Sequence, residues 1–190
     1  MIPLNVPNVV TLSRIILIPL LIGLYYLPEA WLSEQGRNLA ATLVFIFAGI
    51  TDWLDGYLAR RLNQMSAFGA FLDPVADKLI VAGALVVLLH VNRVDMLVAL
   101  IIIGREIAIS ALREWMAKVG QAKSVAVAFI GKLKTMSQMV AIPLLLFHDP
   151  LFGVIDCQWL GTILINVAAV LTVASMLYYM RKALPYASAQ

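Results

Sequence analysis

Charged residues are scarce in this sequence, and cysteine and histidine are almost absent. Only 13% of its 190 residues are charged, whereas 62% are hydrophobic, which is more than a soluble domain of this size could bury. The single cysteine, Cys157, excludes an intramolecular disulfide and a cysteine-based metal site. The net charge of +3 is not gathered in one aromatic-flanked basic patch, so nucleic acid is not an expected partner.

Hydrophobic runs long enough to cross a bilayer recur along the chain. A bilayer core of about 30 Å needs roughly 20 helical residues, and the alternating pattern of a membrane β-barrel is absent. The start of the chain lacks the basic segment and cleavage site of a secretory signal, so we expect the first run to be a retained span. The sequence predicts an all-α, polytopic membrane protein, a single domain over residues 1–190, with spans at 9–27, 37–59, 68–89, 94–116, 125–147 and 160–180.

The basic residues predict the orientation of this six-helix bundle. If the N-terminus lies inside, only Arg37 and Arg93 fall on the outer side. Cytoplasmic loops of membrane proteins carry an excess of lysine and arginine, so we expect both termini in the cytoplasm. The bases that then fall on the cytoplasmic side are Arg60, Arg61, Arg113, Lys118, Lys123, Arg181 and Lys182.

Four aspartates lie within one short stretch of this apolar chain. Asp52 and Asp55 are three residues apart, and Asp73 and Asp77 are four apart, so each pair shares one face of a helix. Carboxylates inside a membrane are costly, and neighbouring ones repel each other. Hard divalent cations favour such oxygen ligands, and a pair of metals suits phosphoryl chemistry. The stretch therefore predicts a two-metal site at the cytoplasmic ends of the second and third spans.

Small residues and a proline accompany the aspartates. Gly56 and Ala59 continue the face of the first pair and would let a ligand or a backbone come close. Arg60, at the edge of that face, could bind phosphate oxygens with two hydrogen bonds. Pro74 either kinks the third helix or marks its first turn, with Asp73 as the cap.

Two other interpretations of the acidic stretch stay open. The carboxylates could pair with Arg60, Arg61 and Lys78 in a buried network. They could also form the proton or sodium relay of a transporter, although a relay needs a path of carboxylates through the membrane. The outer halves of these helices hold none.

The spacing D-x2-D-G-x2-A-R-x8-G-x3-D-x3-D is complete from Asp52 to Asp77, and it resembles the signature of the CDP-alcohol phosphotransferases, membrane enzymes with six transmembrane helices. The resemblance implies two Mg²⁺ or Mn²⁺ ions, a CDP-linked donor and a homodimer. It assigns the metals to Asp52, Asp55, Asp73 and Asp77, with Asp77 also the general base. The donor residues that it implies are Asn8, Thr11, Asp52, Asp55, Gly56, Ala59, Arg60, Ser66 and Gly69.

Other segments resemble bacterial members of the family that use sn-glycerol 3-phosphate as acceptor. They are residues 5–14, Gly104-Arg105-Glu106, residues 110–115 and residues 131–138. The implied partners are CDP-diacylglycerol, sn-glycerol 3-phosphate and membrane lipids, and the implied location is the bacterial inner membrane. Members with serine, inositol phosphate or phosphatidylglycerol as acceptor would share every donor residue and stay an alternative. The residues expected to bind the acceptor phosphate are Arg14, Arg105, Arg113, Lys132 and Lys134.

These bases have a second interpretation. Arg113 lies near the cytoplasmic boundary, where attraction to anionic lipid would also explain it. Arg105, Lys132 and Lys134 lie inside apolar runs and need a partner, and Glu106 is a single acid for several bases.

Direct transfer is the expected mechanism, because no histidine, serine or cysteine is placed to form a covalent intermediate. We expect Asp77 to take the proton of the 1-hydroxyl group of the acceptor. The alkoxide would attack the β-phosphorus of CDP-diacylglycerol, and CMP would leave.

Overall fold

The structure is a computed structural model that describes residues 6–61, 67–121 and 129–187. Within these ranges the chain forms helices and short loops, with one isolated bridge between Leu151 and Ile155 and no strand. This confirms the predicted all-α class. The helices are α1 (Val6–Gly23), the 3-10 turn η1 (Leu24–Tyr26), α2 (Glu34–Arg61), α3 (Ala67–His90), α4 (Met96–Lys118), α5 (Phe129–Phe147) and α6 (Cys157–Ala187).

Three segments of the described helices are long and apolar enough to cross a membrane: Val9–Tyr26, Phe129–Phe147 and Cys157–Tyr186. The helices α2, α3 and α4 carry charged residues within their length, among them Asp52, Asp77 and Arg105. The structure therefore supports a membrane protein through α1, α5 and α6. That all six helices cross the membrane stays a prediction.

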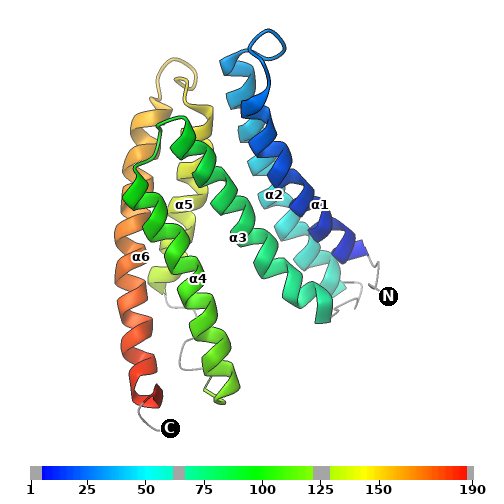
Figure 1. The fold of residues 1–190 in the computed structure, drawn as a ribbon. Helices are drawn as coiled ribbons and strands as arrows, with labels where there is room; N and C mark the ends of the chain where they lie inside the picture. The colour runs from blue at the N-terminus through cyan, green and yellow to red at the C-terminus, as the bar shows by residue number, and fades with distance from the viewer. Residues whose placement is uncertain (1–5, 62–66, 122–128, 188–190) are drawn as a thin grey trace.

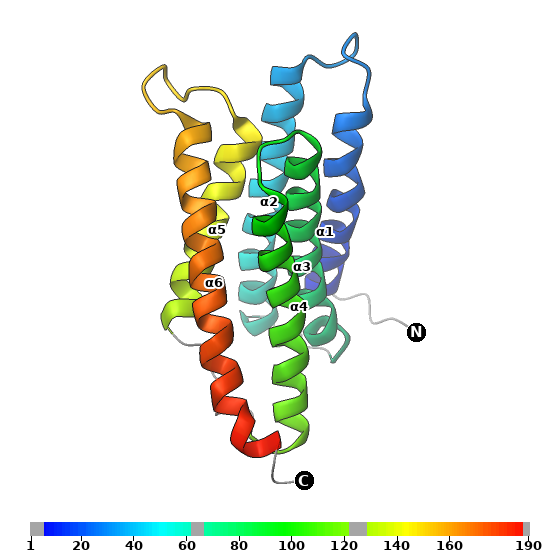
Figure 2. The same ribbon diagram turned by 60° about the vertical axis from the view of Figure 1, so that its left-hand side comes forward.

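The helices form two groups of three (Figure 1). In one group α1 packs against α2 and α3, and in the other α6 packs against α4 and α5. Contacts of α2 with α5 and of α3 with α4 join the groups. Figures 1 and 2 show the α1–α2, α3–α4 and α5–α6 connections at one end of the bundle. The start of α1 and the end of α6 point to the other end, which we call the terminal end.

Glycines bring neighbouring helices close together within the apolar core. A Cβ atom on Gly161 of α6 would lie only 2.8 Å from Cγ of Leu145 on α5. A Cβ atom on Gly83 of α3 would lie 3.2 Å from Cγ2 of Ile18 on α1. Small residues at such contacts allow the close packing on which helix association in membranes depends.

Arg93 links several elements at the end of the bundle where the α1–α2, α3–α4 and α5–α6 connections lie. It is only 8% exposed, although the sequence places it in an outer loop. Its Nη1 donates to the carbonyl oxygens of Leu146 (2.9 Å) and Leu145 (3.2 Å) and to Oδ1 of Asn38 (3.0 Å). Its Nη2 donates to Oε1 of Glu34 at 3.2 Å. The guanidinium thus satisfies carbonyl groups at the C-terminal end of α5, which have no partner within that helix.

Pro74 lies inside α3, more than one turn beyond the first residue of that helix. Asp73 is therefore not the N-cap of α3, and the interpretation of Pro74 as a first-turn proline is wrong. The residues from Ala67 to Asp73 are already part of α3, so the helix begins well ahead of the proline.

Candidate active site

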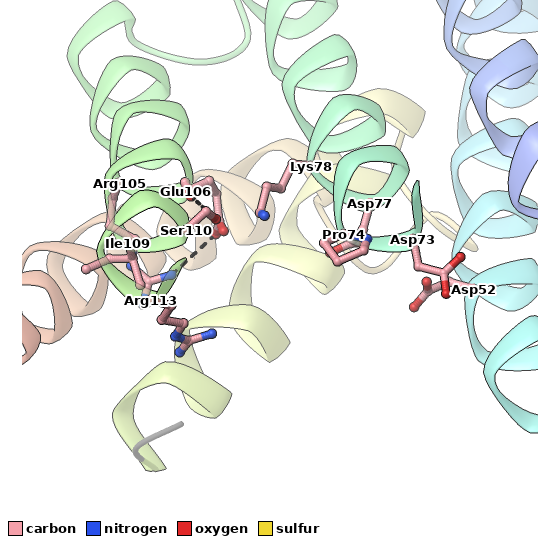
Figure 3. Close-up of a pocket in the computed structure, with 10 residues that line it drawn as sticks. All are labelled: Asp52, Asp73, Pro74, Asp77, Lys78, Arg105, Glu106, Ile109, Ser110 and Arg113. Atoms are coloured by element: carbon pink, nitrogen blue, oxygen red, sulfur yellow. Dashed lines mark hydrogen bonds and ion pairs between the residues drawn. The ribbon is translucent and has the colours of Figure 1, made fainter. Parts of the chain in front are cut away.

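A polar pocket of about 500 Å³ lies between α2, α3 and α4 (Figure 3). Residues 52, 73 and 77 lie in the half of their helices that is nearer the terminal end of the bundle. The pocket is lined by Asp52, Asp73, Pro74, Asp77, Lys78, Arg105, Glu106, Ile109, Ser110 and Arg113.

Three of the four predicted carboxylates lie together on one side of this pocket (Figure 3). Asp52 comes from α2, and Asp73 and Asp77 come from α3. Two buried residues of α1 support them: Thr11 Oγ1 donates to Oδ1 of Asp73 at 2.7 Å, and Arg14 donates to Oδ1 of Asp52 in an ion pair. Helix α1 therefore fixes one carboxylate on each of the two neighbouring helices.

Arg14 occupies a different place from the one expected for an acceptor-phosphate residue. Its side chain is 1% exposed and pairs with Asp52, whereas Arg105 and Arg113 belong to α4. The structure thus realises part of the buried-network interpretation, with Arg14 of α1 as the partner of Asp52.

The remaining donor-side residues are described only in part. Only the backbone is described for five of them, and it belongs to α1 and α2. These residues are Asn8, Asp55, Gly56, Ala59 and Arg60. Ser66 lies outside the described residues altogether. Gly69 is buried in the first turn of α3.

The carboxylates fit a hard divalent cation by their chemistry, since oxygen donors from two helices face one pocket. Among the described residues, no three acidic, histidine or cysteine side chains form a group that could hold a metal ion. The fourth predicted ligand, Asp55, falls outside that comparison because its side chain is not described. The donor set therefore fits Mg²⁺ or Mn²⁺ in chemical type, and its arrangement around an ion stays a prediction.

Basic residues lie on the other side of the pocket. Figure 3 shows Arg105 and Arg113 across the pocket from the aspartates, with Lys78 between the two groups. Glu106, also in the pocket, forms one ion pair with Arg105 Nη1 at 3.6 Å and another with Lys134 of α5. Lys134 is 1% exposed, so its charge is held within the bundle by Glu106.

The structure separates the two lysines that the sequence grouped. Lys132 is exposed and Lys134 is buried, although both belong to α5. Residues two apart on an α-helix point in nearly opposite directions, so both cannot face Glu106. Helical spacing would have distinguished them in the sequence.

Lys78 and Ser110 are among the pocket residues that were not expected from the sequence as parts of the site. Lys78 was considered only as a partner for the aspartates, and its position one residue after Asp77 was the available signal. Ser110 lines the pocket, although no serine was expected to be placed for a covalent intermediate. Its Oγ donates to the carbonyl oxygen of Glu106 at 2.6 Å, within its own helix, so the hydroxyl hydrogen is directed at that carbonyl oxygen.

A second, mainly apolar pocket of about 540 Å³ adjoins the aspartates. It lies between α2 and α5 and shares Asp52 and Asp77 with the polar pocket. Its other lining residues are Phe45, Ile46, Gly49, Ile50, Trp53, Thr135, Met139 and Pro143. Asp77 thus lies where a polar and an apolar space meet.

Comparison with known proteins adds a family and relatives. A profile of the family described as CDP-alcohol phosphatidyltransferase matches residues 4–175. The chain is 50% identical over 182 residues to proteins of Salmonella choleraesuis (strain SC-B67), Shigella flexneri serotype 5b (strain 8401) and Escherichia coli (strain K12). Each alignment covers 94% of this chain and 94% of the relative, and each relative is named CDP-diacylglycerol–glycerol-3-phosphate 3-phosphatidyltransferase.

Proposed function

The chain belongs to the CDP-alcohol phosphatidyltransferase family, and we propose that it transfers the phosphatidyl group of CDP-diacylglycerol to sn-glycerol 3-phosphate. The products are phosphatidylglycerol phosphate and CMP. Relatives that are 50% identical over nearly the whole chain carry this activity in their names. The structural observation that carries the proposal is the polar pocket, with carboxylates on one side and bases on the other.

The acidic side of the pocket suits the donor. Asp52, Asp55, Asp73 and Asp77 would hold two Mg²⁺ or Mn²⁺ ions, which when bound neutralise the pyrophosphate and stabilise the departing CMP. Thr11 and Arg14 keep Asp73 and Asp52 in place from α1. The residues proposed to contact the CDP-lipid are Asn8, Thr11, Asp52, Asp55, Gly56, Ala59, Arg60, Ser66 and Gly69.

The apolar pocket between α2 and α5 suits the diacylglycerol part of the donor. Its walls are mainly apolar side chains such as Phe45 and Ile50, and it reaches Asp52 and Asp77. Acyl chains placed there would stay out of water, while the pyrophosphate stayed beside the aspartates. The lipid would then enter sideways from the bilayer.

The basic side of the pocket suits an acceptor that carries its own phosphate. Arg105 and Arg113 offer planar guanidinium groups, which bind phosphate oxygens with two hydrogen bonds, and Lys78 adds a third positive charge. Lys134 supports this side by sharing Glu106 with Arg105. A neutral acceptor such as serine would leave these bases without an anion, which favours sn-glycerol 3-phosphate over it.

Asp77 is the residue that we assign as the general base. It lines both the polar and the apolar pocket, and Asp52, which also lines both, is paired with Arg14. It takes the proton from the 1-hydroxyl group of the acceptor. The hydroxyl oxygen forms a bond to the β-phosphorus of CDP-diacylglycerol, and the bond from that phosphorus to the bridging oxygen breaks, so CMP leaves with the electron pair. The Ser110 hydroxyl is already bonded to a carbonyl of its own helix, which supports direct transfer without a serine intermediate.

We further propose that all six helices cross the inner membrane of a bacterium and that the chain forms a homodimer. The distribution of basic residues favours a cytoplasmic location for both termini. The aspartates belong to the half of α2 and α3 nearer the terminal end, so the site would open toward the cytoplasm. Water-soluble sn-glycerol 3-phosphate and the membrane-bound donor would meet there.

The release of CMP by the purified protein tests the proposed reaction. Offered CDP-diacylglycerol, Mg²⁺ or Mn²⁺ and one acceptor at a time, the protein should release CMP with sn-glycerol 3-phosphate and far less with serine, inositol phosphate or phosphatidylglycerol. Removal of the divalent metal with a chelator should abolish the release. If no acceptor yields CMP, the enzyme is not a phosphatidyltransferase, and substrate flux without CMP would indicate a transporter.

Substitution of the proposed general base should act on the chemical step. Asp77→Asn should lower kcat by about 10²–10⁴-fold, because general base catalysis contributes about that factor. The matched control is Asp95→Asn at the other end of the bundle, where Asp95 caps α4 by accepting from the Leu97 amide. Asparagine caps a helix as well as aspartate does, so the control should keep full activity. A fully active Asp77→Asn enzyme would contradict the assignment.

Substitution of a pocket arginine should act on acceptor binding. Arg113→Gln should raise the KM for sn-glycerol 3-phosphate about tenfold or more, since a hydrogen bond to a charged group contributes about 1.5–3 kcal/mol. The KM for CDP-diacylglycerol should change little. Lys118→Gln on the same helix is the control, because Lys118 is exposed and pairs only with the exposed Glu114 in the described structure. Equal effects on both substrates would refute the acceptor role of Arg113.

A further inference from the structure

A buried tyrosine lies beside both arginines of the acceptor side. Tyr179 of α6 is completely buried. The Cζ atom of Arg113 lies 5.4 Å from the centroid of its ring, and that of Arg105 lies 5.9 Å from the same centroid. The match to the profile of the family ends at residue 175, before Tyr179.

This contact lowers the repulsion between the two positive charges on the acceptor side. Two guanidinium groups that approach one ring repel each other, and the repulsion is stronger away from bulk water. The face of an aromatic ring attracts cations within about 6 Å, so one ring can hold two guanidinium groups near each other at lower cost. Glu106 pairs with Arg105 Nη1 at 3.6 Å and also with Lys134, so it offsets only part of this repulsion.

The hydrogen bonds of the arginines leave donors for a ligand. Arg105 Nη2 donates to Oγ of Ser175, one turn before Tyr179 on α6, at 3.3 Å. Within the described part of the structure, the buried Nε atoms of Arg105 and Arg113 have no hydrogen-bond partner. Buried donors without a partner are unfavourable, and both residues line the pocket, so a small movement of either side chain would let a phosphate there accept from them.

From these contacts we infer that Tyr179 is a positioning residue that holds Arg105 and Arg113 as a pair for the phosphate monoester of the acceptor. This inference rests on the proposed function and deepens it. Helix α6 contributes no residue to the lining of the polar pocket in the described structure, yet through Tyr179 and Ser175 it would set how tightly the acceptor is bound.

The test compares two substitutions of Tyr179 with one of Tyr26 in the enzyme. Tyr179→Leu removes the ring and should raise the KM for sn-glycerol 3-phosphate about tenfold, with kcat and the KM for CDP-diacylglycerol changed less than about twofold. Tyr179→Phe keeps the ring and should stay within about threefold of the unmodified enzyme. The control is Tyr26→Leu at the other end of the bundle, because the exposed ring of Tyr26 stacks on His90 and should not affect the acceptor.

Two results would overturn the inference. One is an unchanged KM for sn-glycerol 3-phosphate in Tyr179→Leu, whether or not kcat falls. The other is an equal rise in the KM for both substrates, which would indicate a packing role only. If Tyr179→Leu does not fold, Tyr179→Met, which keeps a long apolar side chain without an aromatic face, replaces it with the same expected result. The unmodified enzyme is measured in parallel, so a failure of the proposed function appears as missing CMP release and is not confused with a failure of this inference.

Discussion

A bundle made of a chain that is 62% hydrophobic can hold a charged side chain in its interior only beside a partner, and the arrangement of the helices follows from this constraint. Arg14 of α1 pairs with Asp52 of α2, and Glu106 of α4 binds Lys134 of α5. Arg93 reaches the end of α5 from the α3–α4 connection. Each of these contacts joins different elements, so the polar contacts help to specify which helices are neighbours, while apolar packing supplies most of the buried surface.

The same constraint explains why the polar pocket has two unlike sides. Direct contact of Asp73 and Asp77 with Arg105 and Arg113 would neutralise both groups and leave less charge for a substrate. In the pocket, Asp73 and Asp77 lie apart from Arg105 and Arg113, with Lys78 between the groups (Figure 3). The donor would bind to metal cations held by the aspartates, and the anionic acceptor would bind to the arginines. The two groups therefore have to lie apart. The pocket can therefore bring two negatively charged substrates together without placing both in one basic site.

The sequence was sufficient to predict the helices, because apolar runs and their breaks determine where a membrane helix can form. The predicted spans agree with the six helices to within a few residues at most ends. The largest difference is α6, which continues to Ala187 past Arg181 and Lys182. The cause is that a helix can continue into polar residues beyond the apolar run that identified it.

The part of the site that depends on spacing along one helix was predictable from the sequence. The part that depends on contacts between helices was less predictable. Asp73 and Asp77 face the pocket together as their spacing indicates. The pairing of Arg14 with Asp52 and the contact of Tyr179 with two arginines depend on which helices are neighbours, which no local pattern specifies.

The central claim is that donor and acceptor bind through separate charged groups in one pocket, and inhibition by a short phosphate monoester tests it most directly. n-Propyl phosphate carries the phosphate of the acceptor but no hydroxyl group to react. Initial rates of CMP release should show that it competes with sn-glycerol 3-phosphate and does not compete with CDP-diacylglycerol. Competition with CDP-diacylglycerol would contradict the account, because it would mean that the phosphate groups of both substrates occupy the same site.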